Sequence, residues 1–396
     1  MKQGWEIKKL GEVCTFQRGL TYSKDDEVEH SNNCVLRSNN IDLDSMSIVF
    51  DELKYINDDF VVSEDKKVKP NTILICMSNG SKQHIGKVAF IDKEYGYAFG
   101  GFMGLIKPNT EVSPKFIYYS CISSSYKHFL AGIGNGANIT NLKFSDLQQY
   151  TLPVPPREEQ ESVVAELDCL SGIIEKKREQ LRELDALAQS IFYQMFGDPI
   201  TNEKGWEVST IENVCSSIVR GPFGSALKKE YFVEQSNTTY KVYEQKHAIQ
   251  KDSSIGTYYI SADMFETLSR FEIKEGDIIM SCSGTIGEFY EIPIGAEKGI
   301  MNQALLKYTL NKNIHKIYFL YVMEWVKENF EKKGSGLQNI GSVKTIKSTD
   351  ISLPPLTLQQ QFAEKIGRIE KQKQLIKESI DEMENLFNSR MDYYFN

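Results

Sequence analysis

The chain repeats itself at an interval of 201 residues. Near the start of each copy the repeat consists of Gly4, Trp5, Glu6, Val13 and Cys14, which recur as Gly205, Trp206, Glu207, Val214 and Cys215. Near the far end, Leu152-Pro153 followed by Gln160 recurs as Leu353-Pro354 followed by Gln361. Two diverged copies of one unit, each long enough to bury a core, predict an internal pseudo-twofold repeat. Two similar surfaces suit a ligand that has two separated halves, and DNA is the first candidate.

Composition limits the compartment and the partners. No run approaches the roughly twenty apolar residues of a membrane helix, and the polar start of the chain is unlike a signal peptide, so we expect a cytoplasmic protein with no membrane contact. The seven cysteines include no CxxC pair, which argues against a disulfide framework and a zinc finger. The net charge is -8, and residues 151–200 hold ten Asp or Glu against five Lys or Arg. Because phosphate contacts supply most of the affinity for DNA, such a chain is expected to need a basic partner.

Each copy has the same order of parts. A mixed segment of short apolar runs and turn residues (1–150 and 201–350) predicts an α/β domain, and it contains an aromatic helical stretch at 116–130 or 317–330. A proline linker then leads into a long polar segment with few glycines. Apolar residues there follow the 4-3 spacing of a coiled-coil seam. The seam positions are Val163, Leu167, Leu170, Ile174, Lys177, Leu181, Leu184, Ala188, Ile191 and Met195, and then Ile366, Ile369, Lys373, Ile376, Ile380, Met383, Phe387, Arg390 and Tyr394.

An antiparallel pair would hide both apolar stripes, since Gly197-Asp198-Pro199 ends the first helix and a whole domain precedes the second. The alternative is that each helix packs only on its own domain. Catalytic and cofactor motifs are missing: no GxGxxG follows a strand, and no phosphate-binding GK[ST] loop, HExxH or GxSxG occurs. We therefore expect a protein that binds without catalysing. A stand-alone DNA methyltransferase or nuclease with an unrecognised site, or a scaffold that does not bind DNA, is the alternative.

The order of these parts resembles the specificity subunit of type I restriction-modification systems. The resemblance covers essentially the whole chain. It rests on the Gly-Trp-Glu start of each copy, the Arg-Gly that follows it (Arg18-Gly19, Arg220-Gly221), the Ser-Gly-Thr-Ile-Gly run at 283–287 with a looser counterpart at 78–86, and the proline linker with its Glu159-Gln160 or Gln360-Gln361 pair.

The resemblance implies a four-part chain. Residues 1–152 and 199–353 would be two target-recognition domains, each reading half of a bipartite, asymmetric site in double-stranded DNA. Residues 153–198 and 354–396 would be spacer helices that dock modification subunits, two in number, and the presence of a restriction subunit is left open. No cofactor is expected on this chain, because S-adenosylmethionine, ATP and Mg²⁺ would be bound by the partners.

Residues that can hydrogen-bond base edges gather in loops of both copies, as half-site reading requires. The candidates in the first copy are Arg37, Ser38, Asn39, Asn40, Ser78, Asn79, Ser81, Lys82, Gln83, His84, Asn135 and Asn138. The candidates in the second copy are Arg220, Tyr243, Gln245, Lys246, Ser281, Ser283, Thr285, Gln338 and Asn339. A single Asn or Ser in such a loop is equally well explained as a turn residue, so the matching positions in both copies carry the hypothesis.

Overall fold

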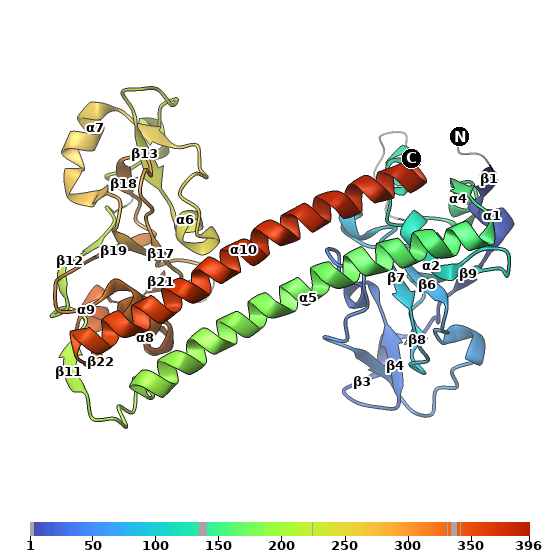
Figure 1. Ribbon diagram of the computed structural model, residues 1–396, viewed down its shortest axis with the longest axis horizontal. Coiled ribbons are helices and arrows are strands. Elements are labelled where there is room, and N and C mark those ends of the chain that lie inside the picture. Colours follow the sequence, from blue (N-terminus) through green and yellow to red (C-terminus); the bar gives the residue numbers. More distant parts are fainter. Residues whose placement is uncertain (1–3, 134–140, 224, 331, 334–338, 341) are drawn as a thin grey trace. The chain divides into compact units, whose positions relative to one another are not determined.

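The computed structural model divides the chain into two compact units. It describes all residues except 1–3, 134–140, 224, 331, 334–338 and 341. Unit 1 consists of residues 1–179 and 376–396, and unit 2 consists of residues 180–375. Each unit combines one mixed α/β segment with parts of two long helices, α5 (Arg157–Phe196) and α10 (Leu356–Phe395) (Figure 1). No helix of the described residues is long and apolar enough to cross a membrane.

The described residues of unit 1 form two four-stranded sheets and one two-stranded ribbon. The first sheet has the antiparallel order β2 (Cys14–Arg18), β9 (Met103–Pro108), β6 (Thr72–Cys76), β7 (Val88–Ile91). The second has the order β3 (Glu27–Val28), β5 (Lys54–Ile56), β4 (Asn33–Leu36), β8 (Ala98–Phe99), with β4 and β8 parallel. The ribbon pairs β1 (Glu6–Lys9) with β10 (Thr151–Val154). The short helices are α1 (Leu10–Val13), α2 (Pro114–Ser120), α3 (Ser124–Gly132) and α4 (Phe144–Leu147).

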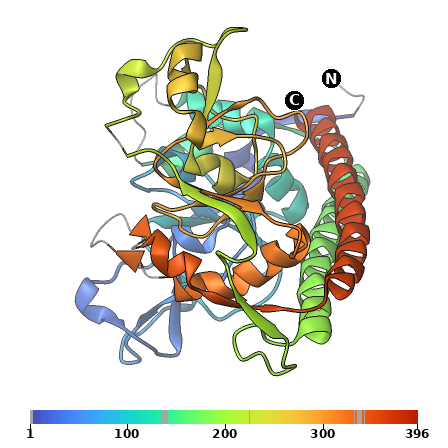
Figure 2. The same cartoon turned by 90° about the vertical axis from the view of Figure 1, so that its left-hand side faces the viewer.

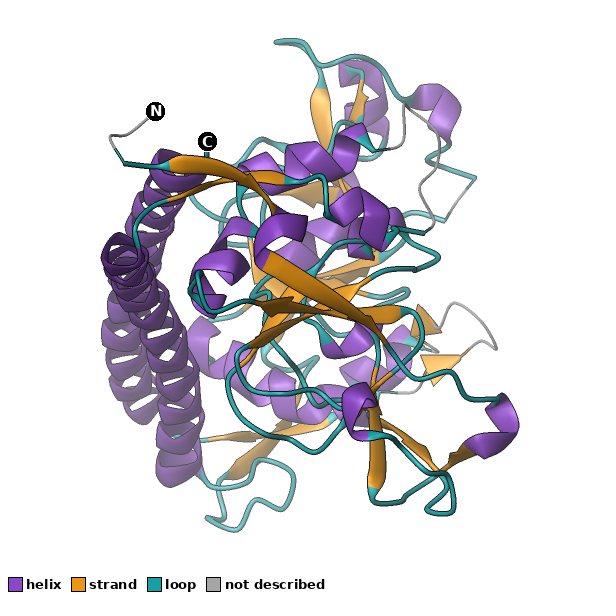
Figure 3. Cartoon of the chain, turned by 90° about the vertical axis from the view of Figure 1, so that its right-hand side faces the viewer, coloured by secondary structure: helices purple, strands orange, loops and turns teal. Residues whose placement is uncertain are grey.

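Unit 2 repeats this arrangement. Its first sheet runs β12 (Cys215–Arg220), β19 (Leu305–Leu310), β16 (Ile278–Ser281), β17 (Phe289–Glu291). Its second runs β14 (Tyr259–Ile260), β13 (Tyr240–Tyr243), β18 (Gly299–Met301), β15 (Glu272–Ile273), again with one parallel pair, β13 and β18. Two ribbons pair β11 (Glu207–Thr210) with β22 (Asp350–Leu353) and β20 (Lys332–Lys333) with β21 (Asn339–Ile340). The helices are α6 (Gln245–Gln250), α7 (Ala262–Thr267), α8 (Lys316–Val326) and α9 (Val343–Lys347). The internal repeat is therefore confirmed. The mixed α/β character is confirmed as well, since Figure 3 shows both helices and strands.

The aromatic stretches form the helices that cover the first sheet of each unit. The stretch at 116–130 forms two helices rather than one, because the chain turns between the end of α2 and Ser123, whose side chain caps α3 by accepting the N–H of Tyr126. The stretch at 317–330 forms α8 and ends in a 3-10 turn, Lys327–Asn329. β6 is buried along its whole length, as a continuous apolar run predicts.

The long helices pack on each other antiparallel. In unit 1, Arg390 donates to both carboxylate oxygens of Glu166, and Arg178 donates to Glu384 at 2.7 Å. In unit 2, Nζ of Lys373 lies 2.7 Å from Asp185. The residue number of the partner on α10 thus decreases as the residue number on α5 increases, which confirms the predicted antiparallel pair. Figure 2 shows α5 and α10 side by side. All of the predicted seam positions are buried or half-buried.

Each long helix ends in the core of the other copy. Tyr394 stacks on Trp5 and Phe395 packs on Phe116, so the end of α10 completes the core of unit 1. Phe192 and Phe196, at the end of α5, are fully buried in the core of unit 2. The alternative in which each helix packs only on its own domain is therefore wrong.

A buried glutamine ties each proline linker to its unit. Oε1 of Gln160 accepts the N–H of Ser113 at 2.7 Å, and its Nε2 donates to the carbonyl of Pro155 at 2.9 Å. In unit 2 the same bonds belong to Gln359, which accepts the N–H of His315 at 2.7 Å and donates to the carbonyl of Pro354 at 2.8 Å. Gln361 is exposed. The pairing of Gln160 with Gln361 expected from the sequence is wrong by two residues, because the strand before each linker is already related by 199 residues, with Val154 and Leu353 at the same place in their ribbons.

Candidate functional site

Unit 1 has an open cavity of about 1010 Å³ at the edge of its two sheets. Its walls come from chain segments that are far apart in the sequence, and five of the predicted candidates line it: Arg37, Ser38, Asn39, Ser78 and Asn79. Nδ2 of Asn79 donates to Oγ of Ser38 at 2.7 Å, which links the turn after β4 to the turn after β6. The structure therefore brings together two loops that the sequence identified separately.

The turn after β4 is built around Asn40. Its side chain is fully buried, with Oδ1 accepting the N–H of Arg37 at 2.9 Å and Nδ2 donating to the carbonyls of Val49 and Asp51. These bonds hold the 3-10 turn Ser38–Asn40. Since both ends of the amide are engaged inside the fold, Asn40 shapes the turn, and we omit it from the residues proposed to face DNA.

Arg37 keeps an unused donor. Its side chain lines the cavity, and its Nε is buried without a hydrogen-bond partner among the described residues. Glu27, one of the two carboxylates that line the cavity, is already paired with Nζ of Lys54 at 2.9 Å. This hydrogen bond from Lys54 is the main reason why the pKa of Glu27 is lowered.

The cavity also contains residues that the candidate set missed. Arg18, at the end of β2, is exposed and donates through Nε to the carbonyl of Gly101 at 3.2 Å. Phe102 is 71% exposed on the cavity wall. Gly19 lies where residues 99–100 cross the chain, and a Cβ there would collide with the carbonyl oxygen of Gly100. The Arg-Gly repeat was visible in the sequence, and this crossing is its structural reason.

The other candidates of the first copy lie outside the cavity lining. Ser81, Lys82 and Gln83 are exposed on or beside the 3-10 turn Lys82–His84. His84 is half-buried, and its Nδ1 is buried without a hydrogen-bond partner among the described residues. Asn135 and Asn138 lie outside the described residues.

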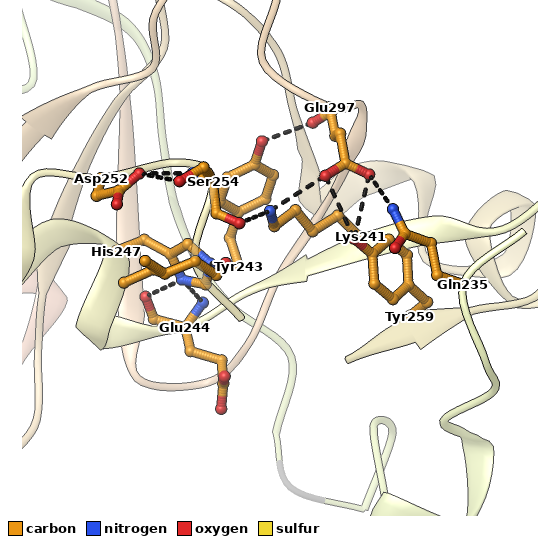
Figure 4. Close-up of polar contacts among 10 residues, drawn as sticks. Gln235, Lys241, Tyr243, Glu244, His247, Asp252, Ser254, Tyr259 and Glu297 are labelled. Atoms are coloured by element: carbon orange, nitrogen blue, oxygen red, sulfur yellow. Dashed lines mark hydrogen bonds and ion pairs between the residues drawn. The ribbon is translucent and has the colours of Figure 1, made fainter. Parts of the chain in front are cut away.

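Unit 2 builds the same turn after β13. His247 is fully buried, accepts the N–H of Glu244 through Nδ1 at 2.8 Å and contacts the carbonyl of Ile255 through Nε2 at 2.7 Å (Figure 4). Burial lowers the pKa of His247, so the ring is a neutral structural group. It occupies the place of Asn40, and Glu244 therefore occupies the place of Arg37.

Two candidates of the second copy are part of the core. Tyr243 ends its parallel strand as Leu36 does in unit 1, and its hydroxyl donates to the carbonyl of Glu297 at 2.6 Å. Ser281 is fully buried, donates to the carbonyl of Thr285 at 2.6 Å and accepts the N–H of Glu288 at 3.0 Å. Because these polar atoms are used within the fold, we omit both residues from the proposed DNA-facing set.

The remaining candidates of the second copy keep accessible surface where the structure describes their side chains. Gln245, Lys246, Ser283 and Arg220 are half-buried and Thr285 is exposed. The guanidinium of Arg220 lies 3.4 Å from the carbonyls of Gln303 and Ile340, so it is held close to the body of unit 2. Asn339 lies in β21, and Gln338 is outside the described residues. Within the described part of the chain, no group of three His, Cys, Asp or Glu side chains is placed to hold a metal ion.

Curated relatives of the chain are specificity subunits. The chain is 24% identical over 389 residues to the "Type I restriction enzyme EcoKI specificity subunit" of Escherichia coli K12, covering 93% of this chain and 82% of that protein. It is 29% identical over 184 residues to the StySPI specificity subunit of Salmonella potsdam, covering 46% of this chain and 40% of that protein.

Solved structures share the fold. A chain from a study of complex assembly and conformational transition of the type I R-M system aligns with a TM-score of 0.59 at 16% identity, covering 99% of this chain and 97% of the other. The type I restriction-modification S subunit from M. genitalium aligns with a TM-score of 0.55 at 14% identity, covering 100% of this chain and 98% of that one.

The family model agrees with both comparisons. The "Type I restriction modification DNA specificity domain" matches residues 2–184 and again residues 203–385, once for each copy. These two matches cover most of the chain and repeat the interval found in the sequence. The chain therefore belongs to the family of DNA specificity subunits of type I restriction-modification systems.

Proposed function

We propose that each mixed α/β segment reads one half of a bipartite, asymmetric DNA site and that the long helices dock two modification subunits. In this proposal residues 1–152 and 199–353 are the recognition domains, and residues 153–198 and 354–396 are the spacer helices. Methyl transfer from S-adenosylmethionine and any ATP-driven step belong to the partners, and this chain binds no cofactor.

The observation that carries the proposal is the cavity of unit 1. It gathers two arginines, Arg18 and Arg37, with the hydroxyl and amide groups of Ser38, Asn39 and Asn79. Arginine pairs with guanine, and amides pair with adenine, in the major groove. A cavity lined with such groups, beside an exposed aromatic ring, suits a base edge and the sugar-phosphate backbone next to it.

Charge supports the need for a partner. A net charge of -8 is unfavourable for binding DNA alone, because neutralised phosphates supply most of the affinity. On α5 the acidic residues Glu158, Glu161, Glu175 and Glu179 are exposed. We propose that this acidic face contacts a modification subunit. Reversing these charges to lysine should weaken co-elution of the complex in gel filtration, whereas unchanged co-elution would mean that the face is only solvated.

The deciding experiment reconstitutes the chain with its modification subunits and sequences the methylated adenines of a random DNA library. The proposal predicts one bipartite motif, and it predicts that substituting Arg18 and Asn39 alters one half of the motif while the other half stays the same. Label transfer from S-adenosylmethionine to DNA by the chain alone would instead indicate a stand-alone enzyme. Absence of sequence-specific binding by the complex at moderate salt would indicate a scaffold.

A further inference from the structure

The two units carry residues of opposite charge at the same place in the fold. Arg37 and Glu244 each follow the last residue of the parallel strand, β4 or β13. The backbone N–H of each is bound by a buried side chain three residues later, Asn40 or His247. These shared bonds establish the equivalence independently of sequence alignment.

Both turns contain buried polar atoms that have no hydrogen-bond partner in the part of the chain that the structure describes. In unit 1 the atom is a donor, Nε of Arg37. In unit 2 the atoms are acceptors, Oε2 of Glu244 and Oε1 of the adjacent Gln245. Native proteins leave few such atoms unpaired, and a ligand that completes the bonds is one explanation.

Oε2 of Glu244 is held in an ion pair, so Oε1 of Gln245 is the acceptor left without any partner among the described residues. Nζ of Lys246 lies 2.7 Å from Oε2 of Glu244, and this ion pair does not have the angles of a hydrogen bond. The carboxylate points away from the ion pair formed by Lys241 and Glu297 (Figure 4). The side chain of Glu244 is 21% exposed as a whole, although Oε2 itself is buried.

We infer that the two turns read bases of complementary chemistry. Arg37 binds a guanine in one half-site, and Glu244 together with Gln245 binds an exocyclic amino group of a base in the other half-site. Guanine presents the acceptors O6 and N7 in the major groove, which an arginine fork can bind. Adenine N6 and cytosine N4 present amino groups, which carboxylate and amide oxygens accept. This inference rests on the proposed function and adds to it one specificity-determining position in each unit.

The test measures base preference in the reconstituted complex. Arg37→Ala should relax one guanine position of one half-site, with discrimination falling about 5- to 150-fold, the equivalent of 1–3 kcal/mol for one bidentate pair. The double variant Glu244→Ala, Gln245→Ala should relax one adenine or cytosine position of the other half-site. Each variant should leave the opposite half-site unchanged.

Matched control variants separate the loss of base recognition from general effects of charge and of folding. Lys24→Ala removes an exposed cation from the wall of the same cavity and should weaken methylation equally for all sequences. Glu266→Ala removes an exposed carboxylate from α7 and should change nothing. Arg37→Lys keeps the charge without the fork, so it should fold normally and still lose the guanine preference. The melting temperature of each variant is measured alongside.

The outcomes are distinguishable. If the wild-type complex methylates no bipartite motif, the proposed function fails. If it does, and a folded Arg37 variant leaves every position unchanged or relaxes a base other than guanine, the assignment of Arg37 is overturned. If the folded Glu244 and Gln245 double variant leaves every position of that half-site unchanged, or relaxes all of them equally, the second assignment is overturned.

Discussion

Replacing the buried amide Gln359 with leucine should destabilise unit 2, whereas the same change at Gln361 should not. Leucine is similar in size but can neither donate nor accept, so the N–H of His315 and the carbonyl of Pro354 would lose bonds of 2.7 and 2.8 Å. A buried polar group without its partner costs about 1–3 kcal/mol. Two such groups predict a loss of about 3 kcal/mol.

The expected loss is large enough to measure by calorimetry. For a domain of about 150–250 residues, 1 kcal/mol shifts the melting temperature by about 2–4 °C, so the transition of unit 2 should fall by roughly 6–12 °C. Gln361 is exposed, and its substitution should stay within about 0.5 kcal/mol of the wild type. Gln160→Leu should produce a similar shift in the transition of unit 1, because its amide makes the same bonds.

Two results would refute this reasoning. If Gln361→Leu lowered the melting temperature as much as Gln359→Leu, the assignment of the buried bonds to Gln359 would be wrong. If both Gln359→Leu and Gln160→Leu stayed within the error of the wild type, the bonds between linker and unit would not contribute to stability.

Three further predictions concern the helices and the strand crossing. Donation from Arg390 lowers the pKa of Glu166, so the folded state favours its charged form. That contribution to stability is present above the unfolded pKa of about 4.3 and is lost as the pH falls through the folded pKa. When the pH is lowered from about 7 to about 3, the urea midpoint of the Glu166→Gln variant should therefore fall less than the urea midpoint of the wild type. Gly19→Ala should abolish folding of unit 1, whereas Gly80→Ala, which has open space around it, should leave the circular dichroism spectrum unchanged. Gly172→Ala, inside α5 and also in open space, should stabilise the chain by up to about 1 kcal/mol, measured as a higher melting temperature.

The sequence predicted the features that depend on local patterns. The repeat and the coiled-coil seam follow from residue spacing, and α5 and α10 pack at the predicted positions. Phe192 was missed because it is not a seam position. It packs into the core of unit 2, where its ring contacts Tyr318. No spacing rule identifies a side chain that contacts a domain formed by distant residues.

The site was predictable only as separate loops. The sequence could not reveal that Asn40 points inward, because an Asn that binds its own turn and an Asn that faces solvent occur in the same sequence context. The role of Gly19 depends on a crossing with residues more than 80 positions away, which no local motif encodes. The equivalence of Glu244 in unit 2 to Arg37 in unit 1 could be recognised only from the buried bonds of Asn40 and His247.

The exchange of helix ends between the copies affects how the chain folds during synthesis. Trp5 and Phe116 are covered by Tyr394 and Phe395, which are synthesised only after the whole of unit 2. The ribosome adds about 5–20 residues per second, so the roughly 200 residues between the two parts of unit 1 take about 10–40 s. During that interval the first unit exposes apolar surface that its own copy cannot cover. Unit 1 can therefore be complete only after unit 2 has been synthesised, and a nascent chain stalled within unit 2 should need chaperone protection.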